Sequence, residues 1–437
     1  MIEIVSIITQ LIFFLVIFSF PFNPLNLNKI LNLKEGTLNL IDAHVTNILF
    51  FIYFCLFSSF LNFDLKLLFK FYIVVSASFF LFNFKKNYFN FERSDILNFI
   101  IFILLIFSIF LLIAQNLKLE WDGHVWIQKA IIFFNNEKLI NLNQTIHPDY
   151  PFLGTYLWAF FWKNSLLELE YLGRFFYIYF YVVSIFFIAS AINIKNENIK
   201  ILLVLFLILI TFETYYFGGY QEYLIFSSLL VVSKFIFILS ENGKKNIKII
   251  FLIFLILYLN TWFKNEGSVY LIIFFISLLY FLKITLFKKI LFFFLTFLSL
   301  IFNFVTQKYI IQISGDSGLS YLINFLQNFD DLKLFFLKFI KIFSHIIIAF
   351  IKHPLWLIFL FSLFFKIFIL KKFNFYTKFF VVSFILNLLV IFGVYLSLGN
   401  IDSMLRITLD RVLFQTSGLY LMIFICIINQ VENKFYK

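Results

Sequence analysis

The sequence predicts an all-α polytopic membrane protein with about thirteen transmembrane helices, and three observations support this fold class. The chain has 437 residues, of which 62% are hydrophobic and only 13% charged, about half the charged share of a soluble domain. Apolar runs long enough to span a bilayer recur along the whole length, and such runs predict transmembrane helices. The lysines gather at the ends of these runs, which is the pattern that orients spans in a membrane.

The same observations exclude other classes of protein. The net charge of +12 comes from lysines at span ends, so we expect no nucleic-acid partner. Both cysteines, Cys55 and Cys426, fall in predicted spans, which argues against a disulfide or a thiolate metal site. The first apolar run is span-length and lacks a basic start and a small-residue cleavage site. We therefore expect it to be a span and not a signal peptide.

Spans are placed by apolar run length, and loops are assigned to a side by their lysines. The predicted spans cover about residues 2–20, 46–62, 65–83, 96–115, 170–193, 199–214, 223–240, 247–263, 268–282, 290–306, 354–370, 376–396 and 411–430. Basic loops are placed inside, so that residues 116–168 and 307–353 form two long outer segments and the C-terminus lies inside. Most carboxylates then fall on the outer side. Acidic residues do not set topology, so this indicates either a site there or the solvation of longer loops.

The outer stretch of residues 330–348 is expected to form an amphipathic helix on the membrane interface. Four basic side chains recur there at spacings of three to five residues, which places them largely on one helical face: Lys333, Lys338, Lys341 and His345. A span would bury three of these lysines at roughly 2.5–3.5 kcal/mol each if central. An interfacial helix avoids this cost.

The first outer loop carries the main catalytic candidate, Asp122, just past the end of a span. If a helix starts at this point, Asp122, Trp126 and Lys129 share one face, because positions i, i+4 and i+7 align. An acid, an aromatic ring and a cation in one row suit a sugar and a phosphate. The alternative is that Asp122 only caps the start of the helix.

Two further features lie in or next to this loop. The segment from His147 to Pro151 reads HPDYP, in which two prolines fix the backbone and display Asp149 and Tyr150; it could also be the mere entry to a helix. Arg174 lies one turn inside the edge of a span. A cation at that depth is a functional candidate by default, and snorkelling toward headgroups is the alternative.

Later outer turns supply more charged candidates. Glu222 follows the flexible Gly218–Gly219 pair, and Lys264 and Glu266 share the short turn KNEG between two apolar spans. Arg406 and Arg411 are placed at the mouth of the last span. Guanidinium groups match the geometry of phosphate oxygens, so these arginines are candidates for binding a phosphate-bearing lipid.

Together, in this order, these motifs resemble the GT-C superfamily of membrane glycosyltransferases. The similarity rests on EWD…W…KA at residues 120–130, HPDYP, GYQE at residues 219–222, KNEG and Arg411. It is greatest to bacterial relatives of protein mannosyltransferases and of the lipid A aminoarabinose and galacturonic acid transferases. The resemblance implies a GT-C-like catalytic module over residues 96–437, preceded by extra N-terminal spans in residues 1–95. It also implies that Asp122 is catalytic and that Glu222 stands where the family usually has Asp.

The resemblance further implies transfer of a sugar from a polyprenyl-phosphate donor to a glycan, lipid or protein acceptor. The reaction would take place on the outer, periplasmic face of a bacterial cytoplasmic membrane. Asp122 would act as the general base in an inverting displacement, and the substrate-binding candidates are Trp126, Lys129, His147, Asp149, Tyr150, Arg174, Glu222, Lys264, Glu266, Arg406 and Arg411. No metal-ligand cluster is visible in the sequence, so no cofactor is assigned, and a divalent metal stays open.

Two other functions are alternatives for a protein of this class. A transporter or flippase of lipid-linked sugars predicts charges in the middle of broken helices and an inverted repeat, and the sequence shows few acids within spans. An O-antigen polymerase or ligase would be expected to rely on outer arginines and a histidine. The short HPDYP and KNEG turns favour the polyprenyl-phosphate-dependent glycosyltransferase instead.

Overall fold

The computed structural model describes residues 2–34, 36–83, 93–114, 117–192, 197–241, 245–313, 325–327, 332–370, 375–398 and 401–435. Throughout these ranges the secondary structure is helical, with no strand. Several predicted basic loops, around residues 85–86, 195, 244 and 371–372, lie outside the described residues.

The N-terminal half contains the helices that lead to and from the first outer loop. They are α1 (Ile2–Phe18), α2 (Pro24–Ile30), α3 (Leu40–Ser59), α4 (Leu65–Asn83), α5 (Arg93–Ala114), α6 (Trp121–Phe134), η1 (Leu139–Gln144), α7 (Leu153–Lys163), α8 (Glu170–Ala189) and α9 (Glu197–Thr211). The C-terminal half contains η2 (Thr214–Phe217), α10 (Glu222–Glu241), α11 (Ile247–Phe263), α12 (Glu266–Phe281), α13 (Leu286–Val305), η3 (Thr306–Ile310), α15 (Leu332–Lys352), α16 (Pro354–Phe364), η4 (Phe365–Ile369), α17 (Phe375–Leu396), α18 (Ile401–Tyr420) and α19 (Met422–Phe435).

Among the described residues, nine helices are long and apolar enough to cross a membrane, so the fold fits a polytopic α-helical membrane protein. All but one of the nine coincide with predicted spans, and the exception is Lys333–Lys352 in α15. The other predicted spans are also helical but shorter, at 10–17 residues: Glu3–Phe18, Asn198–Thr211, Ile247–Phe263, Glu266–Phe281 and Pro354–Ile369. The number thirteen therefore stays a prediction.

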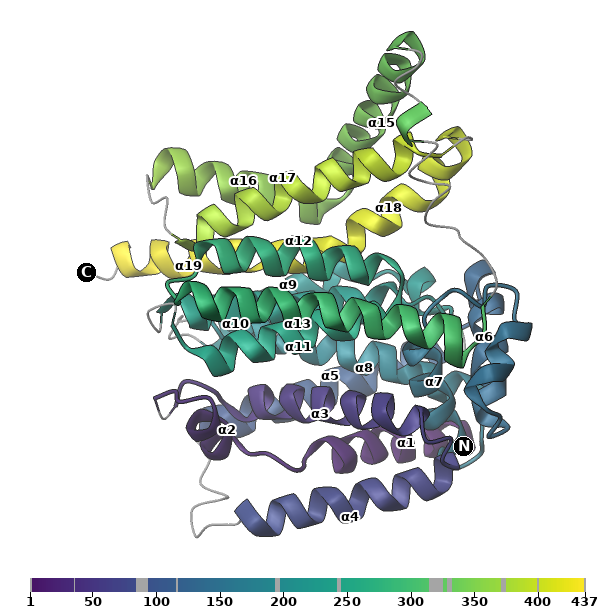
Figure 1. Ribbon diagram of the computed structural model, residues 1–437. Coiled ribbons are helices and arrows are strands. Elements are labelled where there is room, and N and C mark those ends of the chain that lie inside the picture. The colour runs from purple at the N-terminus through teal and green to yellow at the C-terminus, as the bar shows by residue number, and fades with distance from the viewer. Residues whose placement is uncertain are drawn as a thin grey trace.

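Most of the long helices lie side by side in one bundle, and α10 is near its centre (Figure 1). Helix α10 packs against α8, α11 and α18. Every residue in the apolar window of α8 is buried, as expected for a helix that is hydrophobic all round. Helices α6 and α7 lie at one end of the bundle (Figure 1). We call this the Asp122 end, because α6 contains Asp122.

Two predicted loop boundaries are wrong, because helices extend further than their apolar parts. Helix α3 begins at Leu40 and not near residue 46, since Asn39 and Asp42 form a capping box at its start, which stabilises an earlier first turn. The loop predicted from Gly399 to Arg411 is helical from Ile401 onward. Its charged residues predict a loop, but they alternate with Leu405, Leu409 and Leu413, which are buried at i, i+4 and i+8.

The stretch predicted as an interfacial helix is indeed helical, as α15. Its length and composition also suffice for a membrane span. Figure 1 shows α15 steeply inclined to α12 and α17 and extending away from the bundle. Its basic residues are divided between partners and solvent: Lys341 pairs with Asp402 of α18, while Lys333 is exposed.

The Asp122 end is fastened by the side chain of Arg174, which is 1% exposed. Its Nε and Nη2 donate to the two carboxylate oxygens of Glu170 at 2.7 and 2.8 Å. The remaining donors reach backbone carbonyls before α6 and in η2, namely Leu117 at 2.9 Å, Lys118 at 3.3 Å and Phe217 at 3.2 Å. A guanidinium has five N–H donors, so these bonds use them all. In this structure Arg174 therefore joins α8 to two loops, and its role in substrate binding stays a prediction.

Replacing Arg174 by methionine tests this clamp. The change would leave Glu170 and three carbonyls without their donor, and breaking a buried ion pair costs about 3–5 kcal/mol. We expect Arg174→Met to lower the apparent Tm of the detergent-purified protein by several degrees. Lys66→Met, which removes an exposed ion pair with Glu168, is the control and should leave the Tm unchanged. Equal Tm values for the two variants would show that the clamp does not stabilise the fold.

Candidate functional site

Helix α6 places Asp122 in its first turn. The helix begins at Trp121, and its N-cap is Glu120, whose side chain makes no capping hydrogen bond. Asp122 is therefore not the N-cap, although an acidic side chain in the first turn still favours the start of the helix. Its Oδ2 instead accepts a hydrogen bond from Nη2 of Arg411, a residue 289 positions away. The Asp122 side chain is 33% exposed, so it remains accessible from outside the bundle.

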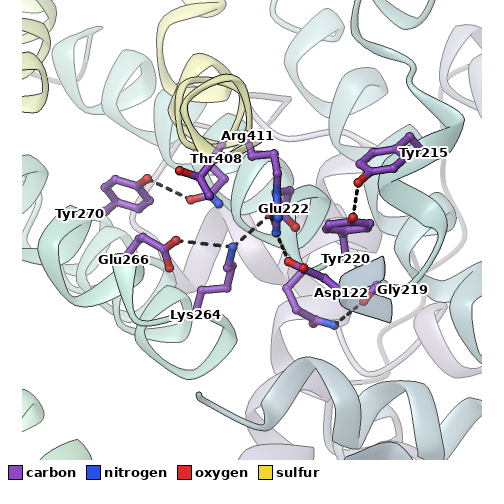
Figure 2. Close-up of polar contacts among 12 residues, drawn as sticks. Asp122, Tyr215, Gly219, Tyr220, Glu222, Lys264, Glu266, Tyr270, Thr408 and Arg411 are labelled. Carbon is purple, nitrogen blue, oxygen red and sulfur yellow. Dashed lines mark hydrogen bonds and ion pairs between the residues drawn. The ribbon is translucent and has the colours of Figure 1, made fainter. Parts of the chain in front are cut away.

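Arg411 also binds Glu222, at the start of α10. Its Nε donates to Oε1 of Glu222 at 2.8 Å, and its Nη2 lies 2.6 Å from the same oxygen. The side chain of Glu222 is completely buried, whereas that of Arg411 is 11% exposed. The guanidinium thus joins a buried carboxylate to a partly exposed one, and in Figure 2 it lies between them.

The turn between α11 and α12 adds a second cation and a third carboxylate. Nζ of Lys264 donates to Oε1 of Glu222 at 3.0 Å and lies 3.5 Å from Oε1 of Glu266. Burial by itself lowers the pKa of Lys264, but the carboxylates of Glu222 and Glu266 outweigh it and raise the pKa above its usual value. The two carboxylates therefore favour the charged form of Lys264.

We call Asp122, Glu222, Lys264, Glu266 and Arg411 the Asp122 cluster (Figure 2). All five were candidates from the sequence, and the structure brings them together from four separate parts of the chain. Three carboxylates face two cations, so the cluster carries one surplus negative charge. Within the described residues, Oε2 of Glu222 is buried and has no hydrogen-bond partner. A polar atom in this state is costly, and a catalytic or binding role is one explanation for it.

Two tyrosines that the sequence analysis did not single out complete the cluster. The ring of Tyr220 lies 4.4 Å from the guanidinium carbon of Arg411, which is a cation–π contact. Its hydroxyl is hydrogen-bonded to that of Tyr215, and Tyr215 is 43% exposed. Burial, the Tyr215 hydroxyl and the Asp122 carboxylate raise the pKa of Tyr220. The GYQE motif contains Tyr220, whereas Tyr215 lies before it and outside the motifs.

The HPDYP turn packs beside the cluster through Tyr150. The Tyr150 ring is stacked on His147 at 4.9 Å and lies 5.5 Å from Trp126. Burial and the carboxylate of Glu266 are the two largest causes that raise the pKa of Tyr150. His147 is exposed and Asp149 half-buried, and the carbonyl of Asp149 accepts a hydrogen bond from Gln307 at 3.2 Å. The turn is thus held in place while His147 stays accessible.

Trp126 and Lys129 lie beneath this turn. As predicted, they share a face of α6 with Asp122, but Trp126 is only 2% exposed and Lys129 is fully buried. The ammonium of Lys129 donates to the backbone carbonyl of Tyr150 and, at 3.5 Å, to that of Pro148. Neither residue presents surface to a ligand, so both support the turn in this structure. Burial lowers the pKa of Lys129 to about 7.

Arg406 does not join the cluster. It is exposed on α18, five residues before Arg411. At 100° per residue, this spacing points the two side chains roughly 140° apart. Both arginines lie within α18, because this helix starts at Ile401 and not near residue 411.

Two cavities in the described part of the chain are not lined by any residue of the Asp122 cluster. One of about 10 Å³ is lined by Tyr150, Trp262 and Gln307, among others, and it is too small for a substrate. One of about 670 Å³ lies at the opposite end of the bundle, around Asp42 and Lys234. Asp122 lines neither, so the pocket expected beside it stays a prediction. In the part of the chain that the structure covers, no group of three or more His, Cys, Asp or Glu side chains could hold a metal ion.

Comparison of the chain with protein-family models, with curated proteins and with solved structures gave no match. The resemblance to the GT-C superfamily therefore rests on the motifs and on the placement of their residues alone.

Gly123 allows the close approach that positions Asp122. A Cβ at this glycine would lie 2.0 Å from the carbonyl oxygen of Gly218, and that oxygen accepts the N–H of Glu120 at 2.9 Å. We expect Gly123→Ala to push α6 away and to lower the apparent Tm, because overpacking a tight contact costs about 1–3 kcal/mol or more. The control is Gly393→Ala in α17, where a Cβ would meet nothing within 4 Å. Equal Tm values for both variants would contradict the tight docking of α6.

Lys129 predicts a pH dependence of stability. Its pKa is about 7 in the folded chain and near the ordinary value of about 10.4 when unfolded. Between these values the unfolded state binds more protons, so this residue makes stability rise with pH. We expect the Tm of the wild type, relative to that of Lys129→Gln, to increase from pH 7 to pH 9. A constant difference across this range would show that the buried amine does not titrate there.

Proposed function

We propose that the protein is an inverting glycosyltransferase that uses a polyprenyl-phosphate sugar donor and a glycan, lipid or protein acceptor of the cell envelope. One observation carries this proposal. The motif residues that resemble the GT-C superfamily are scattered from position 122 to position 411, yet they converge on one cluster. A partly exposed carboxylate beside two cations has the chemistry that such a transfer needs.

The roles of the residues follow from the reaction. The acceptor hydroxyl attacks the anomeric carbon, the bond from that carbon to the phosphate oxygen breaks, and the proton passes to Asp122. The polyprenyl phosphate leaves with the bonding electrons, and Arg411 and Lys264 stabilise its negative charge. Because the phosphate is already a good leaving group, no second catalytic carboxylate of the glycosidase kind is required.

Arg411 would have a further role when the polyprenyl-phosphate sugar donor binds to the site. In the structure it contacts the carboxylates of both Asp122 and Glu222. A donor phosphate that binds Arg411 would compete with Asp122, which is the more exposed of the two carboxylates. Asp122 would then lose its ion pair with Arg411. Its carboxylate would therefore be free to take the proton of the acceptor hydroxyl only when the sugar donor is bound.

The proposal includes a topology in which thirteen helices span a bacterial cytoplasmic membrane and the Asp122 end faces the periplasm. Helix α1 begins at the Asp122 end and α19 ends at the opposite one (Figure 1), as an odd number of crossings requires. Helix α15 would lie on the outer interface. Its inclination to α12 and α17 in Figure 1 and its pairing of Lys341 with Asp402 support this placement.

A transporter or flippase of lipid-linked sugars is the second candidate, and one observation favours it. Asp42 and Lys234 form a buried ion pair within two candidate spans, and intramembrane charges are typical of transport pathways. Reconstituted liposomes separate the two functions. A glycosyltransferase forms a new glycosidic bond and releases polyprenyl phosphate, whereas a transporter moves the lipid-linked sugar across the bilayer unchanged.

Substitution of Asp122 by asparagine tests the proposed function. Asparagine keeps the size of the side chain but cannot take a proton, and general bases contribute about 10²–10⁴-fold. We expect the purified Asp122→Asn variant to release polyprenyl phosphate about 10²–10⁴-fold more slowly than the wild type. In a strain that lacks the protein, this variant should not restore the sugar missing from the surface glycans. The control is Asp402→Asn, on the exposed part of α18, which should restore it. Restoration by Asp122→Asn at the wild-type rate would refute the assignment.

A further inference from the structure

The cavity of about 670 Å³ lies at the end of the bundle opposite to the Asp122 cluster. Its walls come from the N-terminal ends of α3, α5 and α9 and from the C-terminal ends of α8 and α10. Pockets that bind small molecules have volumes of about 300–1,000 Å³ and a few convergent polar groups. The size of this cavity therefore suits a small molecule or a lipid headgroup.

The floor of the cavity is a buried ion pair. Asp42 is 1% exposed and Lys234 is 3% exposed, and the ammonium donates to the Asp42 carboxylate and to Oγ of Ser190. The ring of Phe187 lies 4.2 Å from the same ammonium. Replacing a buried ion pair with apolar residues is often neutral or stabilising. Such a pair is therefore weak evidence of a purely stabilising role, and intramembrane charges are functional candidates by default.

The walls add charges of both signs at separate places. Lys200 lies in the first turn of α9, and Glu241 is the last residue of α10. Helix N-termini favour phosphate groups and helix C-termini favour cations. Lys200 can therefore bind a phosphate and Glu241 an ammonium group, and both line one cavity. With Asp95 and the ion pair, the lining has three carboxylates and two lysines, which disfavours a ligand with several negative charges.

We propose that this cavity binds a small zwitterion that carries an ammonium group close to a phosphate. The phosphate lies at Lys200 and the start of α9, and the ammonium lies at Glu241 and the end of α10. Such a ligand is either a free phosphoethanolamine-like molecule or the headgroup of an aminophospholipid. The proposal does not depend on sugar transfer, because no residue of the Asp122 cluster lines the cavity.

Binding can be measured with the full-length protein in phosphatidylglycerol nanodiscs. We expect O-phosphoethanolamine to raise the apparent Tm in a saturable way, while ethanolamine and glycerol 3-phosphate at the same concentrations do not. A second arm replaces part of the phosphatidylglycerol with phosphatidylethanolamine. A rise in that arm alone identifies the lipid headgroup as the ligand, and a rise with O-phosphoethanolamine identifies the free molecule. No rise in either arm, or an equal rise with glycerol 3-phosphate, would overturn the proposal.

Variants locate the site without disturbing its buried floor. Lys200→Gln and Glu241→Gln change residues that are partly or fully exposed, so both should fold. We expect each to weaken the apparent Kd for the ligand identified above at least tenfold. Lys248→Gln is the matched control. This lysine lies in the first turn of α11, donates to Asn32 at 3.0 Å and does not line the cavity, so the Kd should not change. Wild-type affinity in both cavity variants would overturn the proposal.

Discussion

The guanidinium of Arg411 is the charge on which the Asp122 end of the molecule depends. It contacts a carboxylate from α6 and another from α10, and its own helix, α18, packs along α10. In apolar surroundings an unpaired charge is expensive, whereas a paired one is tolerated. The requirement to neutralise Glu222, which has no exposed surface, therefore draws Arg411 and Lys264 to one point, and Asp122 joins them from the side that is open.

The residues around the Asp122 cluster hold the backbone there in a fixed position. Arg174 holds the segments on both sides of the site by their carbonyls, and Gly123 lets α6 approach η2 more closely than any other residue would allow. Gly219 next to it has a φ of +105°, a conformation that favours glycine. These supports fix the positions of the charged groups in the Asp122 cluster.

Helix α10 connects two polar regions of different character. It carries Glu222 at its first residue and Lys234 nearer its other end, and each is paired with a residue from another helix. The first region is partly exposed and contains an acid next to two cations. The second is a cavity with charges of both signs on its walls. The bundle thus has distinct chemistry at its two ends, and one buried helix extends between them.

The sequence by itself determined the class of fold and the position of nearly every long helix. The length of an apolar run can be read directly from the sequence, and a helix needs such a run wherever it is buried in a bilayer or in the interior of the bundle. It failed at Leu40 and Ile401, where capping and a buried leucine row extend helices into polar sequence. The motifs also identified all five residues of the Asp122 cluster. The motifs could not distinguish the cluster residues from Lys129 and Arg174, because the sequence does not show which partner a charged residue near a span contacts.

Only the tertiary structure decided which partner each charged side chain contacts. The donors of Arg174 and Lys129 are taken up by backbone carbonyls that come from distant segments, and no spacing rule encodes those partners. Asp42 and Lys234 are 192 positions apart in the sequence. The sequence therefore does not indicate that they pair, or that they line a common cavity. Burial and pairing arise from packing between helices, and a charge in an apolar bundle acquires its role from the neighbours that packing supplies.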